Sequence, residues 1–389
     1  MKRLAPTPYE FLVAKVASMW KVHPEDSWKR EVRPHMGGEL LGMIDCVRYD
    51  PLFKMAATAY LMNPKLQDPA NLQCAMAEHE AVYNFWTSGK KVFQVAGDLT
   101  KMLMGTDLRA SKFMLGLPFP CLYIRFEEAP FEIYCASDKS WMPADGVYVW
   151  DGMFAREQRL STDEMVGLMR DPAYPVAEAP RLRTLRIVAV SRDAATGTGN
   201  MSFAHLPWEH PDDTVVDDDF IESNLPQWEY HDFFVPVARI ALLAIAYINS
   251  VGADVRRDRP HSDQKQDELA RQQGCGRPPA KLYRAAAALS KLSYYAVGDA
   301  IRLPSGGTPV RETTECGTYR SHSYRYLVRG HPHTYWKNTA NLSEEERRPG
   351  VLRRELGDKS AVLKFILPHF RGPDTAEVVN KAYAVTMKK

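Results

Sequence analysis

The sequence predicts an α+β fold: a helical N-terminal region, then a mixed or antiparallel sheet with packed helices, then a basic C-terminal β module. Good helix formers dominate up to about residue 104, and short apolar runs bounded by Pro, Gly and Asp follow from residue 117. Net charge changes sign near residue 281. We divide the chain into a helical region (1–106), a central α+β domain (107–255), a flexible linker (256–280) and the basic module (281–389).

Composition indicates an ordinary globular protein. Of 389 residues, 45% are hydrophobic and 25% charged. The six cysteines are scattered without a C-x-x-C pair, which argues against a zinc knuckle and fits free thiols in a reducing compartment. The N-terminus lacks the apolar run of a signal peptide. We therefore expect a cytoplasmic protein with no membrane partner.

The charge is unevenly distributed. From Lys281 to Lys389 there are 19 Lys and Arg against 10 Asp and Glu, so this part carries +9. Because the whole chain carries +2, the first 280 residues carry −7. A basic module on an acidic body predicts either an anionic partner, such as RNA or the ribosome, or docking of the two parts on each other.

Three helices are expected in the N-terminal region. The run Leu52–Met62 consists of helix formers and stops before a proline. Asn71 is a suitable N-cap for a second helix, which Gly89 would end. In a third, Val95–Met104, Leu99 and Leu103 recur on one face.

Strands are expected next. The apolar run Leu117–Phe126, bounded by prolines, predicts a buried strand, and Phe131–Tyr134 and Val147–Trp150 predict two more. Leu182–Val190 is rich in β-branched residues, and Asn200–Leu206 is expected to pair with it across a glycine-containing turn.

The longest apolar run is Val235–Val251, which Arg239 and Asn249 interrupt. It falls short of the ~20 apolar residues that a membrane span requires. We therefore interpret it as a buried helix.

The C-terminal third alternates polar and apolar segments. The polar stretch after Arg256 predicts a linker, and the charged stretch Asn338–Lys359 an insertion. Between and after them we expect an alanine-rich helix at Lys281–Leu292 and strands at Tyr295–Leu303, Arg320–Trp336 and Ala361–Leu367.

The most informative stretch is Tyr324–Trp336. Pro332 within it cannot donate to a ladder, so this strand should lie at a sheet edge or be bulged there, where an extended peptide can pair. With a period of two, one face is apolar and suited to packing, and the other is cationic. The apolar face holds Tyr324, Tyr326, Val328, Pro332 and Trp336, and the other Arg325, Leu327, Arg329, His331, His333 and Tyr335.

Four interpretations of the cationic face remain open. It binds a peptide or a phosphate backbone through arginine forks, or His331 and His333 act as an acid–base pair. Alternatively the two histidines ligate a metal with His322 or His369, or the face is simply solvated. No carboxylate or cysteine stands at ligand spacing, so no metal or cofactor is expected. Because hydrolase, zincin, kinase and P-loop motifs are also missing, the sequence favours a recognition protein over a conventional enzyme.

Three motifs carry a family resemblance. The run Arg329–Trp336 resembles the R-G-H-x-H-x-Y-W signature of a type V-A anti-CRISPR family. Leu117–Ile124 is similar to that family's L-P-x-x-C-x-Y-[IV] strand, and Tyr295–Gly298 to its Y-x-[IV]-G strand. The motifs occur in the same order, and the similarity covers roughly residues 110–371.

The resemblance implies a phage or plasmid protein that blocks biogenesis of the type V-A CRISPR effector nuclease. Such proteins recognise the N-terminal segment of the nascent effector polypeptide and cause loss of its mRNA. The alternatives are a metal-independent RNase that uses His331 and His333, and a protein of the same architecture with another target. The contact residues we expect are Arg325, Arg329, His331, His333, Tyr335, Trp336 and Arg371.

Overall fold

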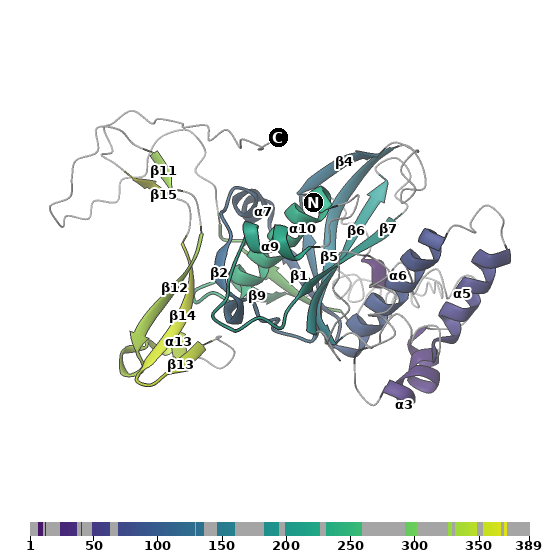
Figure 1. Ribbon diagram of the computed structural model, residues 1–389, viewed down its shortest axis with the longest axis horizontal. Helices are drawn as coiled ribbons and strands as arrows, with labels where there is room; N and C mark the ends of the chain where they lie inside the picture. The colour runs from purple at the N-terminus through teal and green to yellow at the C-terminus, as the bar shows by residue number, and fades with distance from the viewer. Residues whose placement is uncertain are drawn as a thin grey trace, which may run out of the picture.

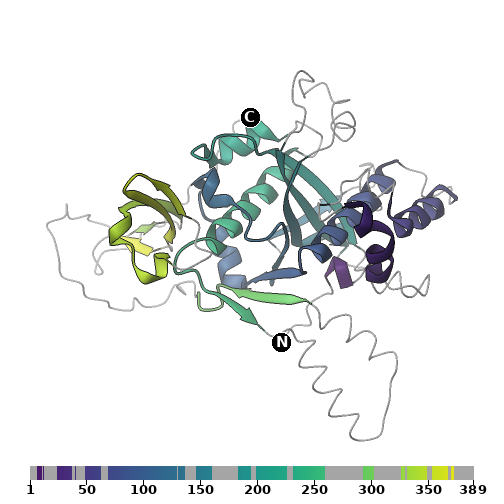
Figure 2. The ribbon, with the colours of Figure 1, turned by 90° about the horizontal axis from the view of Figure 1, so that it is seen from below.

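The computed structural model describes residues 7–10, 12, 24–36, 40, 49–62, 69–128, 130–135, 146–159, 183–193, 199–225, 231–258, 292–301, 326–328, 331–347, 353–366 and 369–371. Helices and strands are mixed along the chain, with helices first, so the α+β prediction is confirmed. Figures 1 and 2 show a central sheet between two sets of helices, with a smaller C-terminal sheet beside it.

The central sheet is eight-stranded, in the order β7-β6-β5-β3-β1-β10-β9, with β4 paired to β5. Strands β1, β3 and β10 run parallel to one another, and the remaining pairings are antiparallel. The strands are β1 (Lys91–Val95), β3 (Cys121–Phe126), β4 (Phe131–Cys135), β5 (Gly146–Arg159), β6 (Arg183–Asp193), β7 (Gly199–Pro207), β9 (Val255–Asp258) and β10 (Ser293–Val297). The strands expected from Leu117 to Leu206 are therefore all confirmed.

Strand β3 shows why this sheet forms. All six of its residues are buried, because helices cover both faces. Leu122 and Ile124 belong to the core on one face, and Cys121 and Tyr123 to the core on the other. Cys121 is a free thiol whose burial raises its pKa to about 12, so it stays protonated and unreactive.

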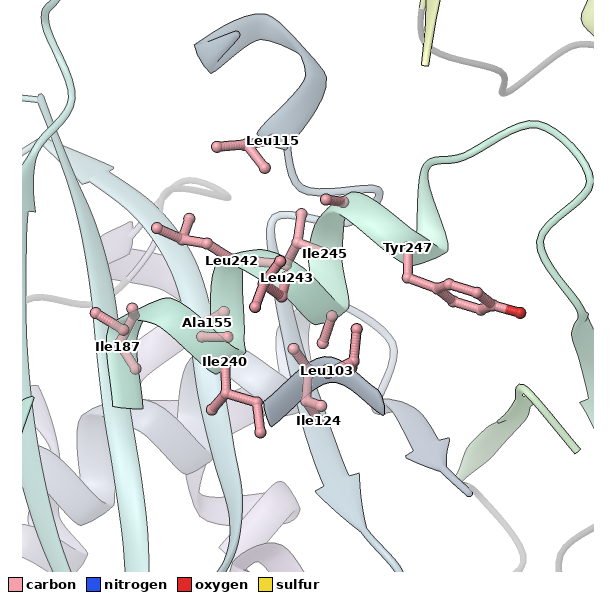
Figure 3. Packing of buried hydrophobic residues seen from close by; sticks show 14 of the residues in the cluster. Leu103, Leu115, Ile124, Ala155, Ile187, Ile240, Leu242, Leu243, Ile245 and Tyr247 are labelled. Atoms are coloured by element: carbon pink, nitrogen blue, oxygen red, sulfur yellow. The ribbon is translucent and has the colours of Figure 1, made fainter. Parts of the chain in front are cut away.

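One face is covered by α7 (Gly97–Met104), α9 (Asp218–Asn224) and the long α10 (His231–Ile248). Figure 3 shows apolar side chains of α10 packed with Leu103, Ile124 and Ile187. The polar interruptions of this run have partners: Arg239 donates to the Thr106 carbonyl at 2.6 Å, and Asn249 to those of Met114 and Gly116 at 3.0 and 2.8 Å. None of the helices among the described residues combines the length and apolarity needed to cross a bilayer.

The other face is covered by the N-terminal helices: α2 (Pro24–Ser27), the π-helical turn η1 (Trp28–Val32), α3 (Arg33–Met36), α5 (Pro51–Met62) and α6 (Pro69–Thr87). Glu80 of α6 forms ion pairs with Arg156 of β5 and Arg186 of β6, and all three side chains are buried. This triad joins α6 to the middle of the sheet.

The C-terminal part forms two small sheets. In one, β12 (His331–Asn338), β14 (Lys359–Ile366) and β13 (Arg353–Leu356) pair in that order, with 3₁₀ turn η3 (Thr339–Asn341) and α13 (Glu344–Arg347) in the insertion. In the other, β11 (Tyr326–Val328) pairs with β15 (His369–Arg371). A third pair, β2 (Arg109–Ser111) and β8 (Val215–Asp217), lies near β12, with 3₁₀ turn η2 (Lys112–Leu115) following β2.

The three-stranded sheet docks on the body through β14. The Val251 amide donates to the Leu363 carbonyl at 3.0 Å, and the rings of Tyr247 and Phe365 are 5.5 Å apart. Arg354 of β13 lies over the ring of Phe113, 5.8 Å from its centroid. The second expectation from the charge asymmetry is that the two parts dock on each other, and these contacts are mainly apolar. The ion pair between Arg256 and Asp299, 3.3 Å apart, also joins the first 280 residues to the C-terminal part.

Two N-terminal expectations are wrong. The helical run is interrupted by β1, whose alternating Val92, Phe93 and Val95 suit a strand with neighbours on both sides. Asn71 lies inside α6 and does not cap it, because the helix begins at Pro69, where a proline is favoured.

Two C-terminal expectations are also corrected. The strand expected to run to Leu303 ends at Val297, because Gly298 adopts a left-handed φ of 76°. The strand expected at Arg320–Trp336 is two strands in different sheets, β11 and β12. The helix expected at Lys281–Leu292, apart from the buried Leu292 just before β10, and all but the first residues of the linker lie outside the described residues.

Candidate functional site

The histidine motif lies on β12, whose hydrogen-bonded neighbour among the described strands is β14 on one side only. It is therefore an edge strand, as Pro332 led us to expect. His331, His333, Tyr335 and Lys337 lie on one face of β12 at a period of two. We call these four side chains, with Lys364 opposite His333 on β14, the histidine face.

The opposite face explains why the histidines point away from the body. Pro332 is buried, and its cross-strand partner Phe365 packs against the main core. Leu363 and Ala361 of β14 belong to the same core. Because successive side chains of a strand alternate, burial of this set turns His333 and Lys364 to the other side of the sheet, where His333 is exposed and Lys364 half-exposed. Further along that side Val362 and Ser360, opposite Tyr335 and Lys337, are buried.

Three aromatic rings follow one another along the histidine face. The rings of His331 and His333 are 6.2 Å apart at 89°, and those of His333 and Tyr335 are 4.4 Å apart at 70°. The Lys364 ammonium lies 6.0 Å from the centre of the Tyr335 ring. Imidazole, phenol and ammonium groups are thus gathered on one face of the sheet, where His333 is exposed and His331, Tyr335 and Lys364 are half-buried.

A buried carboxylate, Glu346 of α13, lies against the two lysines of the histidine face. Its Oε1 is 2.6 Å from the Lys337 Nζ and 3.7 Å from the Lys364 Nζ. Its Oε2 accepts from the Ser343 amide at 2.8 Å, while the Glu346 amide donates to the Ser343 hydroxyl at 3.3 Å. This reciprocal pair is a capping box. The hydrogen bond from Lys337 and the Ser343 amide lower the pKa of Glu346 to about 2.

The structure brings together three of the seven predicted contact residues: His331, His333 and Tyr335. Trp336 was expected both on the apolar face and as a contact residue. It lies on the face opposite the histidines, as expected, but near the strand end, where 49% of it is exposed. Arg371 is in β15, opposite Tyr326, in a different sheet. Arg325 and Arg329 lie outside the described residues.

Sequence reasoning missed Lys337, Lys364 and Glu346. Ser343-Glu344-Glu345-Glu346 matches the S-x-x-E pattern of a capping box, which was the available signal for Glu346. Lys364 became visible only through the strand register, which places it opposite His333. The described residues contain no cluster of three His, Cys, Asp or Glu side chains able to hold a metal ion.

Comparison with protein families gives one match: the model "AcrVA2-like: Anti-CRISPR type V subtype A2 family" matches residues 93–369, well over half of the chain. The chain belongs to the AcrVA2-like anti-CRISPR family. The match runs from β1 to β15 and includes the histidine face. A solved structure titled "Crystal structure of AcrVA2" is similar over 94% of this chain and 99% of its own, at 10% identity and a TM-score of 0.48. A comparison with curated proteins finds no match.

Two of the three motifs that resemble the AcrVA2-like family are structural. The first, around Cys121, is the buried strand β3, and the second, ending in Gly298, is β10. A Cβ at Gly298 would come within 2.4 Å of Leu99. Only the histidine motif places its polar side chains at a surface, which makes it the candidate site.

Proposed function

We propose that this chain inhibits biogenesis of a type V-A CRISPR effector nuclease in the cytoplasm. In this proposal it recognises the N-terminal segment of the nascent effector and triggers loss of the effector mRNA. The observation that carries the proposal is the histidine face with its exposed His333 on an edge strand, within the segment that matches the AcrVA2-like family. The basic C-terminal part would lie toward the ribosome or its RNA.

An extended polypeptide is the ligand that an edge strand suits best. It can add to the side of β12 that has no hydrogen-bonded neighbour among the described strands, and its alternating side chains would then reach both faces. One set would lie beside His333 and Tyr335, and the other beside the half-exposed Trp336. Aromatic residues are frequent binding hot spots.

The proposal is tested by separating the encoded peptide from its RNA. A target gene is recoded synonymously over its first codons, and a second version is frameshifted over the same stretch and then restored. If the peptide is recognised, transcript loss persists in the recoded gene and disappears in the frameshifted one. The opposite result, in which transcript loss disappears in the recoded gene and persists in the frameshifted one, would contradict peptide recognition.

The adjacent imidazoles favour one alternative from another class, an RNase with His331 and His333 as acid and base. Purified protein incubated with the target transcript, without ribosomes, discriminates the two. Cleavage that is lost in His333→Ala would support the enzyme. An intact transcript there, with decay only during translation, supports recognition.

A further inference from the structure

We propose that the histidine face contains a carboxylate-binding subsite, in which Lys364, His333 and Tyr335 hold an Asp or Glu side chain of the bound polypeptide. This inference rests on the proposed function and adds the chemistry of the partner. Glu346 lies at hydrogen-bond distance from Lys337 but not from Lys364.

Both oxygens of Glu346 are used by other groups. Oε1 lies 2.6 Å from Lys337 Nζ, and Oε2 accepts from the Ser343 amide. Lys364 Nζ is 3.7 Å from Oε1, which is an electrostatic contact but too long for a hydrogen bond. Glu346 therefore orients Lys364 without taking its hydrogens, and 40% of the Lys364 side chain is exposed.

The neighbours of Lys364 are suited to the same ligand. His333 is its direct cross-strand partner and is exposed, and the Tyr335 ring lies under its ammonium. A carboxylate accepts hydrogen bonds from an ammonium, an imidazole N–H and a phenolic hydroxyl. Three donors of different kinds are thus neighbours on this face of the sheet, with the exposed His333 among them.

The charge of the face favours one carboxylate over a chain of phosphates. The carboxylate of Glu346 offsets one of the two lysines. Lys337, Lys364 and Glu346 together therefore carry a net charge of +1. Nucleic-acid backbones are bound by several cations that each neutralise a phosphate. The aromatic Trp336 lies on the other face of the sheet, so it cannot stack a base beside Lys364.

The alternation of β12 adds a sequence pattern for the ligand. In an extended peptide beside β12, a side chain over the histidine face is followed by one on the side of Trp336. The subsite therefore predicts an acidic residue next to a large apolar one. A glutamate at the first position can reach the ammonium of Lys364, which already leans over Tyr335 toward β12.

A charge swap tests the subsite. Labelled overlapping peptides from the N-terminal segment of the effector are titrated with the full chain, each acid being replaced by its amide or by lysine. One acid should matter: its amide weakens binding about 10- to 100-fold, and Lys364→Glu weakens the native peptide similarly. Lys364→Glu with the lysine-substituted peptide should recover most of the affinity. The control is Lys359→Glu, the same change at an exposed position on the other face of β14.

The outcomes separate the two proposals. If the wild-type chain binds the native peptide but Lys364→Glu binds it equally well, the subsite is wrong and peptide recognition stands. Loss of binding without recovery in the charge swap also overturns the subsite. If the wild type binds no peptide, or if a single-stranded RNA is the ligand lost in Lys364→Glu, both proposals fail.

Discussion

Gly298 closes β10 with a φ of 76°, in direct contact with Leu99 of α7. Gly252 has nearly the same φ, 77°, but a Cβ there would meet nothing within 4 Å. Replacing Gly252 by alanine therefore incurs only the free-energy cost of a left-handed backbone. Replacing Gly298 adds the steric overlap of the new Cβ with Leu99. The glycine of the second family motif is explained by both costs together.

This comparison yields a prediction. Gly252→Ala should destabilise the fold by about 1 kcal/mol, because alanine is strained in the left-handed region. Gly298→Ala should cost about 2–4 kcal/mol, since overpacking against Leu99 is added. Urea unfolding of both variants measures the difference, and equal costs would show that the contact with Leu99 is unimportant.

Glu346 gives a pH dependence. Because its pKa in the folded state is lowered to about 2, its charged form stabilises the protein above the unfolded pKa near 4.5. That contribution is lost as the pH falls from about 5 toward 2. The stability difference between wild type and Glu346→Gln should thus be constant at neutral pH and shrink over this window. Glu344→Gln, at an exposed position of the same helix, is the control. A difference that persists at pH 2 would contradict the assignment.

At the scale of elements, α6 depends on one buried carboxylate. Glu80 pairs with Arg156 and Arg186, so its removal leaves two guanidinium groups in the core. Removing one partner of a buried ion pair typically costs about 3–5 kcal/mol. Glu80→Ala should therefore lower stability by that amount in urea unfolding, whereas Glu78→Ala on the same helix should change it by less than about 1 kcal/mol. Similar losses in both would remove the special role of the triad.

The sequence predicted those elements that are encoded by a continuous run of apolar or β-branched residues. The apolar run of β3, the β-branched run of β6 and the long apolar helix α10 are at or near their expected positions. Lys91–Val95 was missed as a strand because it is short and lies between helices, and only β3 and β10 beside it stabilise it. The buried triad was equally invisible, since it depends on the register between distant strands.

The candidate site was predicted only in part, because some of its residues come from one strand and others from distant elements. The period of two along β12 correctly grouped His331, His333 and Tyr335, because alternation is a local property. Lys364 and Glu346 belong to other elements, and the fold alone brings them there. The sequence placed Trp336 on the correct face but did not show that it would be half-exposed, because that depends on where the body beneath the strand ends.

At the scale of the whole molecule, the three-stranded sheet lies beside the body (Figure 1). Strand β14 holds it there, through Phe365 against Tyr247 of α10 and through the Leu363 carbonyl, which accepts from Val251 just after α10. Stability comes from the face toward the body and from Glu346 beside Lys337, while His333 and Lys364 are accessible on the other face. Replacing His333 and Lys364 with alanine should therefore spare the fold, and this makes the functional claim testable in cells.

The most direct test compares effector transcript levels in cells that express three versions of the chain at equal abundance. The wild type should reduce the effector transcript during translation, and the control Lys359→Ala should reduce it equally. The double variant His333→Ala/Lys364→Ala should remain folded but leave the transcript at its uninhibited level. Full transcript loss with that double variant would show that the histidine face is not the recognition surface.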